Sequence, residues 1–286
     1  MGKDVNVEVF EDTIECCSNN EALIKAIKQS VDNQVIYIEH DTCLLYRSDN
    51  YRLTEFGNLV VSKKRTLEAA LKYKDYRVAV LNFASFKNPG GGVVKGASAQ
   101  EESLCRCSSL YPCLSQEKMM EGFYYPHREL HDPCYNDDII YTPGVKVIKT
   151  DLADEPRPMP PAYWYDVDVI TCAAPNIRAL RDKINKGEIT DRMLLSDERI
   201  QDIHEKRLRR ILDVAVMNDV SVIILGAFGC GAFGNDPEIV AKAASNVLPD
   251  YLDKFATIEY AIYCSPKDNR NYQVFNQILG GLRGTK

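Results

Sequence analysis

The chain has 286 residues, of which 45% are hydrophobic and 27% charged, and its formal net charge is −6 at pH 7. These values are typical of a globular protein with one large domain, or one domain with an extension. The acidic balance argues against general binding to nucleic-acid phosphates, which requires a basic surface, so we expect no direct nucleic-acid partner.

The sequence shows no pattern of a membrane or secreted protein. No apolar run approaches the ~18 residues that a membrane-spanning helix needs, and residues 1–6 lack the apolar core of a secretory signal. We therefore expect an intracellular protein of the cytoplasm, or of the nucleus in a eukaryote, that does not bind membranes. The ten cysteines are then expected to be reduced thiols.

Residues 1–75 are predicted to form a helical extension that leads into a core over residues 76–286. Apolar residues at helical spacing predict a helix over residues 20–31, and residues 34–38 alternate like a strand. Thr66 opens a further short predicted helix.

The remainder of the chain alternates between predicted strands and helices. A buried strand is expected over residues 78–81, and a helix from Ser98 or Ala99 to about Ser109. Residues 111–143, rich in Tyr, Pro, His and Asp, are predicted to form a long irregular excursion. The later expected elements are a strand over 145–148, a strand over 168–173, a long helix that includes Ile200 to Ala215, a strand over 220–225, a helix from Asp236 or Pro237, a strand over 258–263 and a helix over 269–279.

This alternation, with apolar strands buried on both faces, predicts a layered α/β/α fold. Ligands of such folds collect beyond the carboxyl ends of the strands. The unusual segments of this chain follow Leu81, Ile170 and Leu225. We therefore expect one site built from all three segments.

A glycine-rich segment, Gly226 to Gly234, follows a predicted buried strand and precedes a helix. Its four glycines let the backbone adopt positive φ and expose N–H groups beside a helix N-terminus. This arrangement suits a diphosphate, although a tight strand-to-helix turn would also explain the glycines. The segment is not a P-loop, because no Gly-Lys-Ser/Thr follows it. Phe228 and Phe233 either anchor the turn in the core or form an apolar wall against a ribose or adenine ring.

Three consecutive glycines, Gly90 to Gly92, follow Asn88 and Pro89. Such a run is expected where the backbone passes very close to another group, here as a second loop over the same diphosphate and sugar. After seven intervening residues come Gln100, Glu101 and Glu102.

Adjacent glutamates commonly lie on solvated helix surfaces, but their place after the triple glycine favours a chemical role. A carboxylic acid can protonate the leaving oxygen of a glycosidic bond, and a carboxylate can activate water. Neighbouring helical residues point about 100° apart. We therefore expect one glutamate to transfer the proton and the other to position a ribose hydroxyl. A helix N-terminus lowers a carboxyl pKa, whereas burial beside a like charge raises it.

Two loose groups of Cys and His residues suggest a metal site. They are Cys105, Cys107 and Cys113, and His127, His131 and Cys134. Neither group contains the paired C-x-x-C spacing that is typical of zinc sites. We therefore expect no metal and no cofactor.

Taken together, the motifs resemble those of bacterial-type (microbial) poly(ADP-ribose) glycohydrolases. The resemblance rests on the triple glycine with Gln100-Glu101-Glu102, on the longer run Val80 to Gly92, on Ala173 to Asn176 and on Gly226 to Gly234. It covers roughly residues 15–280. It implies a three-layer α/β/α macrodomain with a mixed, mostly parallel sheet and an N-terminal helical extension. It also implies hydrolysis of ribose–ribose bonds, mainly from the chain end, with release of ADP-ribose.

The resemblance also implies residue roles, within a catalytic loop over 88–102 and a phosphate loop over 226–234. Glu102 would be the acid/base that protonates the leaving ribose hydroxyl, and Glu101 would bind ribose hydroxyls. The residues expected to bind substrate are Asn88, Gly90, Gly91, Gly92, Gln100, Gly229, Cys230, Gly231, Ala232 and Phe233. Asn176 is a candidate adenine contact.

Asn82 and Ser85 stand where vertebrate-type members have an acidic residue and an asparagine, so ribose recognition is expected to follow the microbial pattern. Tyr124 and Tyr125 either cover the site or pack as ordinary surface residues. The expected partners are poly(ADP-ribose) or ADP-ribose and ADP-ribosylated proteins, and the protein is expected to be a monomer. Two alternatives stay open: a macrodomain reader that binds ADP-ribose without cleaving it, and a hydrolase of mono-ADP-ribosyl links.

Overall fold

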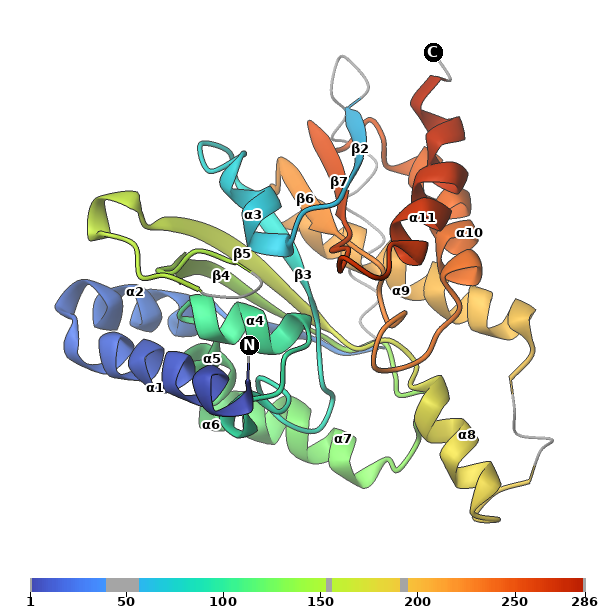
Figure 1. Cartoon of the computed structure of the whole chain (residues 1–286), viewed down its shortest axis with the longest axis horizontal. Helices are drawn as coiled ribbons and strands as arrows, with labels where there is room; N and C mark the ends of the chain where they lie inside the picture. The colour runs from blue at the N-terminus through green and yellow to red at the C-terminus, as the bar shows by residue number, and fades with distance from the viewer. Residues whose placement is uncertain (1, 40–56, 153–155, 191–194, 285–286) are drawn as a thin grey trace.

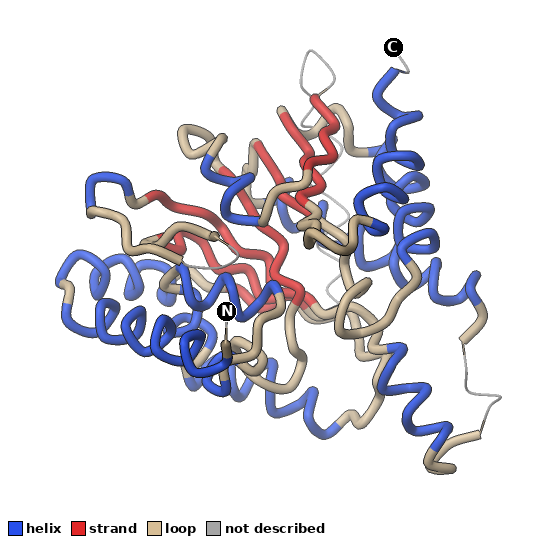
Figure 2. The backbone as a smooth tube through the Cα atoms, viewed as in Figure 1, coloured by secondary structure: helices blue, strands red, loops and turns tan. Residues whose placement is uncertain are grey.

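The computed structural model describes residues 2–39, 57–152, 156–190 and 195–284. These residues form a seven-stranded sheet with helices on both faces (Figures 1 and 2). Its strands lie in the order β1 (Val35–Tyr37), β4 (Ile139–Val147), β5 (Tyr165–Cys172), β3 (Val78–Phe83), β6 (Val222–Leu225), β7 (Thr257–Ala261) and β2 (Asn58–Ser62). β4 is antiparallel to both of its neighbours, and the other adjacent pairs are parallel. The predicted three-layer α/β/α fold with a mixed, mostly parallel sheet is therefore confirmed.

The alternation of side chains along the central strand β3 divides the core into two layers. Ala79 and Leu81 point to one face, where they join the core under the C-terminal helices. Val78 and Val80 point to the other face, where they pack with residues of the N-terminal half of the chain. The helices over the first face are α9 (Asp197–Met217), α10 (Pro237–Val247) and α11 (Arg270–Gly280) (Figure 1).

The second face is covered by short helices together with the first helix of the chain. They are α1 (Lys3–Asn19), α3 (Thr66–Leu71), α4 (Gln100–Cys107) and α5 (Leu110–Leu114). The further helix α2 (Glu21–Asp32) lies beside α1 (Figure 1). The described residues also contain short 3₁₀ turns: η3 (Val93–Lys95), η5 (Pro161–Tyr163), η7 (Leu248–Asp250) and η8 (Gly281–Gly284).

Local capping signals begin several helices where the sequence predicts them. Asn20 accepts hydrogen bonds from the N–H groups of Ala22 and Leu23 at the start of α2. Asp236 caps α10 by accepting from the N–H of Glu238, and Pro237 occupies the first helical position.

The prediction of an irregular excursion over residues 111–143 is wrong. This range contains α5, α6 (Glu117–Met119), the π-helical turn η4 (Met120–Tyr124), α7 (Tyr125–Glu129) and the first residues of β4. Met119, Phe123 and Tyr124 are fully buried there. Tertiary packing stabilises these short turns, which are too short to form through local propensity alone.

Two further elements differ from the predictions. β4 begins at Ile139 rather than at the predicted Val145. The sheet register shifts between Thr142 and Val145, where Gly144 has a φ of +65°. This irregularity interrupts the alternating pattern that the prediction relied on. A separate helix, α8 (Ile177–Asn185), precedes α9.

Residues 1–75 contribute strands as well as helices. β1 and β2 fall in this range and form the two edges of the sheet. The division between an extension and a core at residue 75 stays a prediction. Across the described ranges, no helix has the length and apolar character needed to cross a membrane.

Candidate active site

A cavity of about 370 Å³ lies at the carboxyl ends of the parallel strands. Its volume falls within the range of small-molecule sites. The structure brings together the three predicted segments, which follow β3, β5 and β6, and adds residues that follow β7 and β2. The predicted site residues that line the cavity are Gly91, Gln100, Glu101, Glu102, Gly229, Gly231, Ala232 and Phe233.

Gln100 fixes the start of α4 against the end of β3. Its Oε1 accepts a hydrogen bond from the N–H of Phe83 at 2.9 Å. Its Nε2 donates to the carbonyl of Leu81 at 2.7 Å and to the hydroxyl of Thr66 at 3.1 Å. These contacts hold the first turn of α4, and therefore the two glutamates, over the carboxyl end of β3.

The carboxyl group of Glu101 is buried and held by several donors. The N–H of Ser85 donates to its Oε2 at 2.7 Å, and the Asn82 amide donates to its Oε1 at 3.3 Å. Burial raises the pKa of Glu101 to about 8, and the nearby Glu102 adds to this, while the bonds from Ser85, Asn82 and Gly90 act in the opposite direction. Asn82 and Ser85, which the sequence analysis singled out, thus both hold Glu101.

Glu102 differs from its neighbour because one of its oxygens is uncommitted. Its Oε1 accepts from the N–H of Gly92 at 2.9 Å. Its Oε2 is buried, yet no described residue donates a hydrogen bond to it. A buried polar atom without a partner is energetically unfavourable unless a ligand or a proton satisfies it. Glu102 is therefore the carboxyl of the pair that retains an oxygen for chemistry.

The triple glycine brings the backbone against these two carboxylates. A Cβ atom on Gly91 would lie 2.5 Å from Oε1 of Glu102 and 3.0 Å from Oε2 of Glu101, and the residue has a φ of +60°. Gly90 has a φ of +67°, and a Cβ there would lie 2.8 Å from the ring of Tyr111. Only glycine fits both positions without strain.

Four predicted substrate contacts do not line the cavity: Asn88, Gly90, Gly92 and Cys230. Asn88 is exposed, and its side-chain oxygen accepts from Arg128 at 3.3 Å. The N–H of Gly92 is engaged by a carboxylate, and Gly90 packs against Tyr111. In this structure the glycine run therefore positions the glutamates, and direct diphosphate binding by it stays a prediction.

The glycine-rich turn after β6 presents its backbone to the cavity. Gly231 is exposed, and a Cβ atom there would meet no atom within 4 Å. Within the described ranges, the N–H groups of Gly231, Ala232 and Phe233 donate to no protein acceptor. Successive free N–H groups of this kind make an anion site. Cys230 is half-buried and does not line the cavity.

The two phenylalanines of this turn both form part of the cavity wall. Phe228 is 6% exposed and packs against Phe83 with ring centroids 5.6 Å apart, so it is also a core anchor. Phe233 is half-buried and lies 6.4 Å from the ring of Tyr135. The two predicted alternatives, anchor and wall, therefore both apply to Phe228.

α9 supports this turn from behind. His204 hydrogen-bonds through Nε2 to the side-chain oxygen of Asn235 at 2.9 Å. The Asn235 amide donates to the carbonyls of Pro175 and Gly229 at 2.8 and 3.1 Å, so it joins the loops after β5 and β6. Burial lowers the pKa of His204 to about 4, which keeps this histidine neutral near pH 7.

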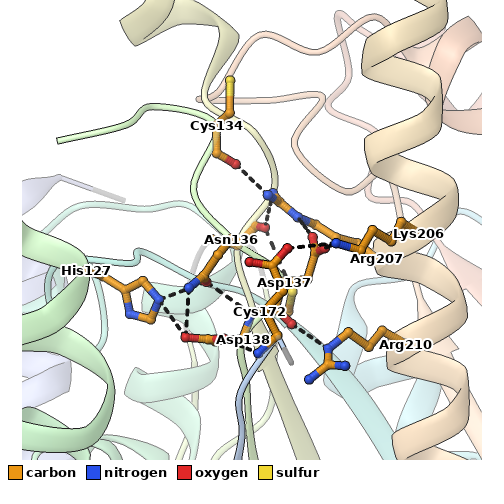
Figure 3. Close-up of polar contacts among 11 residues, drawn as sticks. His127, Cys134, Asn136, Asp137, Asp138, Cys172, Lys206, Arg207 and Arg210 are labelled. Atoms are coloured by element: carbon orange, nitrogen blue, oxygen red, sulfur yellow. Dashed lines mark hydrogen bonds and ion pairs between the residues drawn. The ribbon is translucent and has the colours of Figure 1, made fainter. Parts of the chain in front are cut away.

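Arg207 extends the same support to neighbouring segments (Figure 3). Its guanidinium donates to the carbonyl of Ala173 at 2.8 Å and to that of Cys134, and it pairs with Asp137 at 2.8 Å. Arg210 donates to the backbone carbonyl of Asp137. These contacts fix the segment before β4 beside the loop after β5.

The Cys and His groups that suggested a metal site serve other roles. Cys105, Cys107 and Cys113 are buried in the core, and burial raises their pKa values. His127 is buried and bonds to Asn136 at 2.9 Å (Figure 3). Among the described residues, no three His, Cys, Asp or Glu side chains are grouped to hold a metal ion.

Three other residues singled out in the sequence lie outside the cavity lining. Tyr124 is fully buried in the core, and Tyr125 is exposed beside the Arg128 guanidinium. Neither tyrosine covers the site. The side chain of Asn176 caps α8 by accepting from the N–H of Ala179.

Sequence reasoning missed several cavity residues that come from distant parts of the chain. Arg65 pairs with Asp151 at 2.7 Å, and both bond to the hydroxyl of Ser103. Tyr263 and Asn271 line the end of the cavity beyond β7, and the Arg65 guanidinium lies 5.0 Å from the Tyr263 ring centroid. The one local signal for this group is the position of Tyr263 at the carboxyl end of the strand predicted over residues 258–263.

The fold and the cavity define an α/β protein with two buried carboxyls facing a backbone anion site. Residues 7–150 match the family described as the catalytic domain of microbial-type PARG, where PARG denotes poly(ADP-ribose) glycohydrolase. The chain belongs to this family, which confirms the resemblance in its motifs.

Solved structures agree with this assignment. The chain is 29% identical to poly(ADP-ribose) glycohydrolase from Thermomonospora curvata, with a TM-score of 0.83 over 96% of this chain and 99% of that one. A second structure of that enzyme, bound to the inhibitor ADP-HPD, has a TM-score of 0.79 over the same shares. The enzyme from Deinococcus radiodurans in complex with ADP-ribose is 28% identical, with a TM-score of 0.77 over 90% of this chain and 97% of that one. The comparison with curated proteins found no match.

Proposed function

We propose that this protein hydrolyses the ribose–ribose bonds of poly(ADP-ribose) with Glu102 as the acid/base and releases ADP-ribose, mainly from the chain end. Membership of the glycohydrolase family makes the chain a glycosidase that acts on poly(ADP-ribose). The observation that carries the residue assignment is the uncommitted, buried Oε2 of Glu102 in the cavity wall.

The proposed chemistry moves one proton in each direction. The protonated Glu102 gives its proton to the leaving ribose oxygen as the glycosidic C–O bond breaks. The resulting carboxylate then takes a proton from the water that attacks the anomeric carbon, which restores the acid. Glu101, fixed by Ser85 and Asn82, accepts hydrogen bonds from ribose hydroxyls and holds the sugar in line.

The two ends of the cavity suit the other parts of ADP-ribose. The free N–H groups around Gly231 bind the diphosphate without a cationic side chain, which fits the acidic charge of the chain. Tyr263 and Asn271 supply an aromatic face and an amide beyond β7, the combination that recognises a heteroaromatic base. We assign the adenine to that end.

A reader of ADP-ribose would need the anion site but no acid. The burial of Glu101 and Glu102 supports catalysis, because burying two neighbouring carboxyls is unfavourable for folding and is expected where the pair has a chemical role. ADP-ribosylated proteins inside the cell are the partners we propose, since the expected substrate is carried on them.

The test follows product release from labelled poly(ADP-ribose) by the wild type, by Glu102→Gln and by the exposed control Glu117→Gln. We expect free ADP-ribose from the wild type and the control, and a loss of about 10²–10⁴-fold in Glu102→Gln with ADP-ribose binding retained. Oligomeric rather than monomeric product would contradict cleavage from the chain end. No product from any protein, with ADP-ribose still bound, would favour a reader or a mono-ADP-ribosyl hydrolase.

A further inference from the structure

The N-terminal helix α1 contacts both η3 and α4, the helix that carries the two glutamates. None of its residues lines the cavity, yet two of its polar side chains, Asn6 and Thr13, are buried against that segment. We propose that α1 is a positioning element of the active site, which holds the triple-glycine loop and α4 in the register that catalysis needs.

The first contact runs from Asn6 to the carboxylate of Glu102. Asn6 is 1% exposed, and its Nδ2 donates to the carbonyl of Gly96 at 2.9 Å. Gly96 closes the turn over η3, so that the N–H of Ala97 reaches the carbonyl of Gly92 at 3.2 Å. The N–H of Gly92 is the donor that holds Glu102 at 2.9 Å. One hydrogen-bonded path thus joins α1 to the proposed acid.

Gly96 also fits closely against the backbone of α1. Its φ is +72°, and a Cβ atom there would lie 2.3 Å from the carbonyl oxygen of Lys3. No other residue can occupy this position without displacing the helix or the turn. The turn after the triple glycine is therefore built around the presence of α1.

The second contact fixes the other end of α4. The hydroxyl of Thr13 donates to the carbonyl of Arg106 at 2.5 Å. The guanidinium of Arg106 in turn donates to the carbonyl of Ala97 at 2.6 Å. α4 and the turn that precedes it are thereby tied to each other and to α1.

The third contact reaches the triple glycine through two aromatic rings. Phe10 packs edge-on against Tyr111, with ring centroids 4.9 Å apart. A Cβ atom on Gly90 would lie 2.8 Å from the same Tyr111 ring. Lys149 anchors α1 to the remainder of the fold, because its ammonium donates to the carbonyl of Val9 at 2.7 Å and pairs with Asp12 at 2.6 Å.

The inference rests on the proposed role of Glu102, and its test separates the two. Asn6→Leu and Thr13→Val keep the branching of the side chain and remove its hydrogen bonds, and Glu11→Gln on an exposed face of α1 is the control. We expect kcat to fall about tenfold in Asn6→Leu and in Thr13→Val, since small misplacements of reacting groups have large effects. The control Glu11→Gln should keep the kcat of the wild type. KM and the ADP-ribose dissociation constant should stay within about twofold of wild type, as the anion site is separate.

Hydrogen exchange gives a readout that does not depend on activity. In Asn6→Leu the Gly92 amide should exchange about tenfold faster than in wild type, because opening of the turn becomes easier. An unchanged kcat and exchange rate in both variants would overturn the proposal. So would a loss of kcat that merely follows the fraction of folded protein at the assay temperature. An inactive wild type would instead contradict the proposed function. Faster exchange of the Gly92 amide in Asn6→Leu would then still support α1 as a positioning element.

Discussion

At the scale of single residues, the site depends on a carboxyl pair whose members face different surroundings. Glu101 accepts bonds at both of its oxygens, whereas Glu102 has an oxygen without a donor. One residue is thus suited to hold a sugar and the other to move a proton. The pattern of two adjacent glutamates predicts that their roles differ, and the contacts from Asn82 and Ser85 support the roles proposed above.

The raised pKa of Glu101 makes stability depend on pH. An unfolded glutamate loses its proton near pH 4.5, whereas folded Glu101 keeps it up to about pH 8. The folded state therefore binds more protons between these values, and the free energy of unfolding falls as pH rises through them. At about 1.4 kcal/mol per pKa unit, the decrease amounts to a few kcal/mol.

Denaturant unfolding of wild type and Glu101→Gln at pH 5 and pH 8 measures this effect. We expect the wild type to lose stability between the two values and Glu101→Gln to lose much less, because it has no proton to release. Exposed Glu117→Gln should behave like the wild type. Equal pH dependence in all three proteins would show that Glu101 ionises at an ordinary pH.

At the scale of elements, the loops after β5 and β6 act as one unit because a single amide joins them. Asn235 bonds to the carbonyls of Pro175 and Gly229, and a Cβ atom on Gly229 would lie 2.6 Å from its Nδ2. His204 on α9 orients this amide. The glycine-rich loop after β6 is therefore supported by a helix that contributes nothing to the cavity wall.

Asn235→Ala should loosen both loops at once. It leaves the buried carbonyl of Pro175 without its donor, whereas the carbonyl of Gly229 keeps the backbone N–H of residue 235. An unsatisfied buried group lowers the free energy of unfolding by about 1–3 kcal/mol. We expect weaker ADP-ribose binding together with reduced thermal stability, measured by calorimetry and by thermal unfolding. Binding as tight as in the wild type would mean that the loop holds its shape without the amide. Asn246→Ala, which removes an exposed contact to Glu205, is the matched control.

At the scale of the whole molecule, ADP-ribose should stabilise the fold, because the site is built from segments spread over most of the chain. A ligand at a hundred times its dissociation constant adds about 2.7 kcal/mol to the free energy of unfolding. We expect this gain in wild type and in Glu102→Gln. Gly231→Val should lose it at the same ligand concentration, because its side chain would enter the open space beside the free N–H groups.

Thermal unfolding with and without ADP-ribose measures these gains. Gly231 does not have a positive φ, so the valine should leave the stability of the ligand-free protein near that of wild type. Full ligand stabilisation of Gly231→Val would place the diphosphate elsewhere. A lost gain in Glu102→Gln would make that residue part of the binding site rather than the acid alone.

Local patterns in the sequence are enough to predict the layered fold, the glycine-rich loop after β6 and the place of the two glutamates beside it. These features are local: strand and helix periodicity, capping residues and glycine runs act over a few neighbouring positions. Other features of the protein depend on its tertiary structure, and local patterns do not predict them. In the folded chain the triple glycine contacts the glutamates, and residues 111–143 contain several short helices. Arg65 and Tyr263 line the cavity, and α1 packs against the segment that carries the two glutamates. Each of these depends on contacts between residues far apart in the chain, and such contacts form only when the whole core packs.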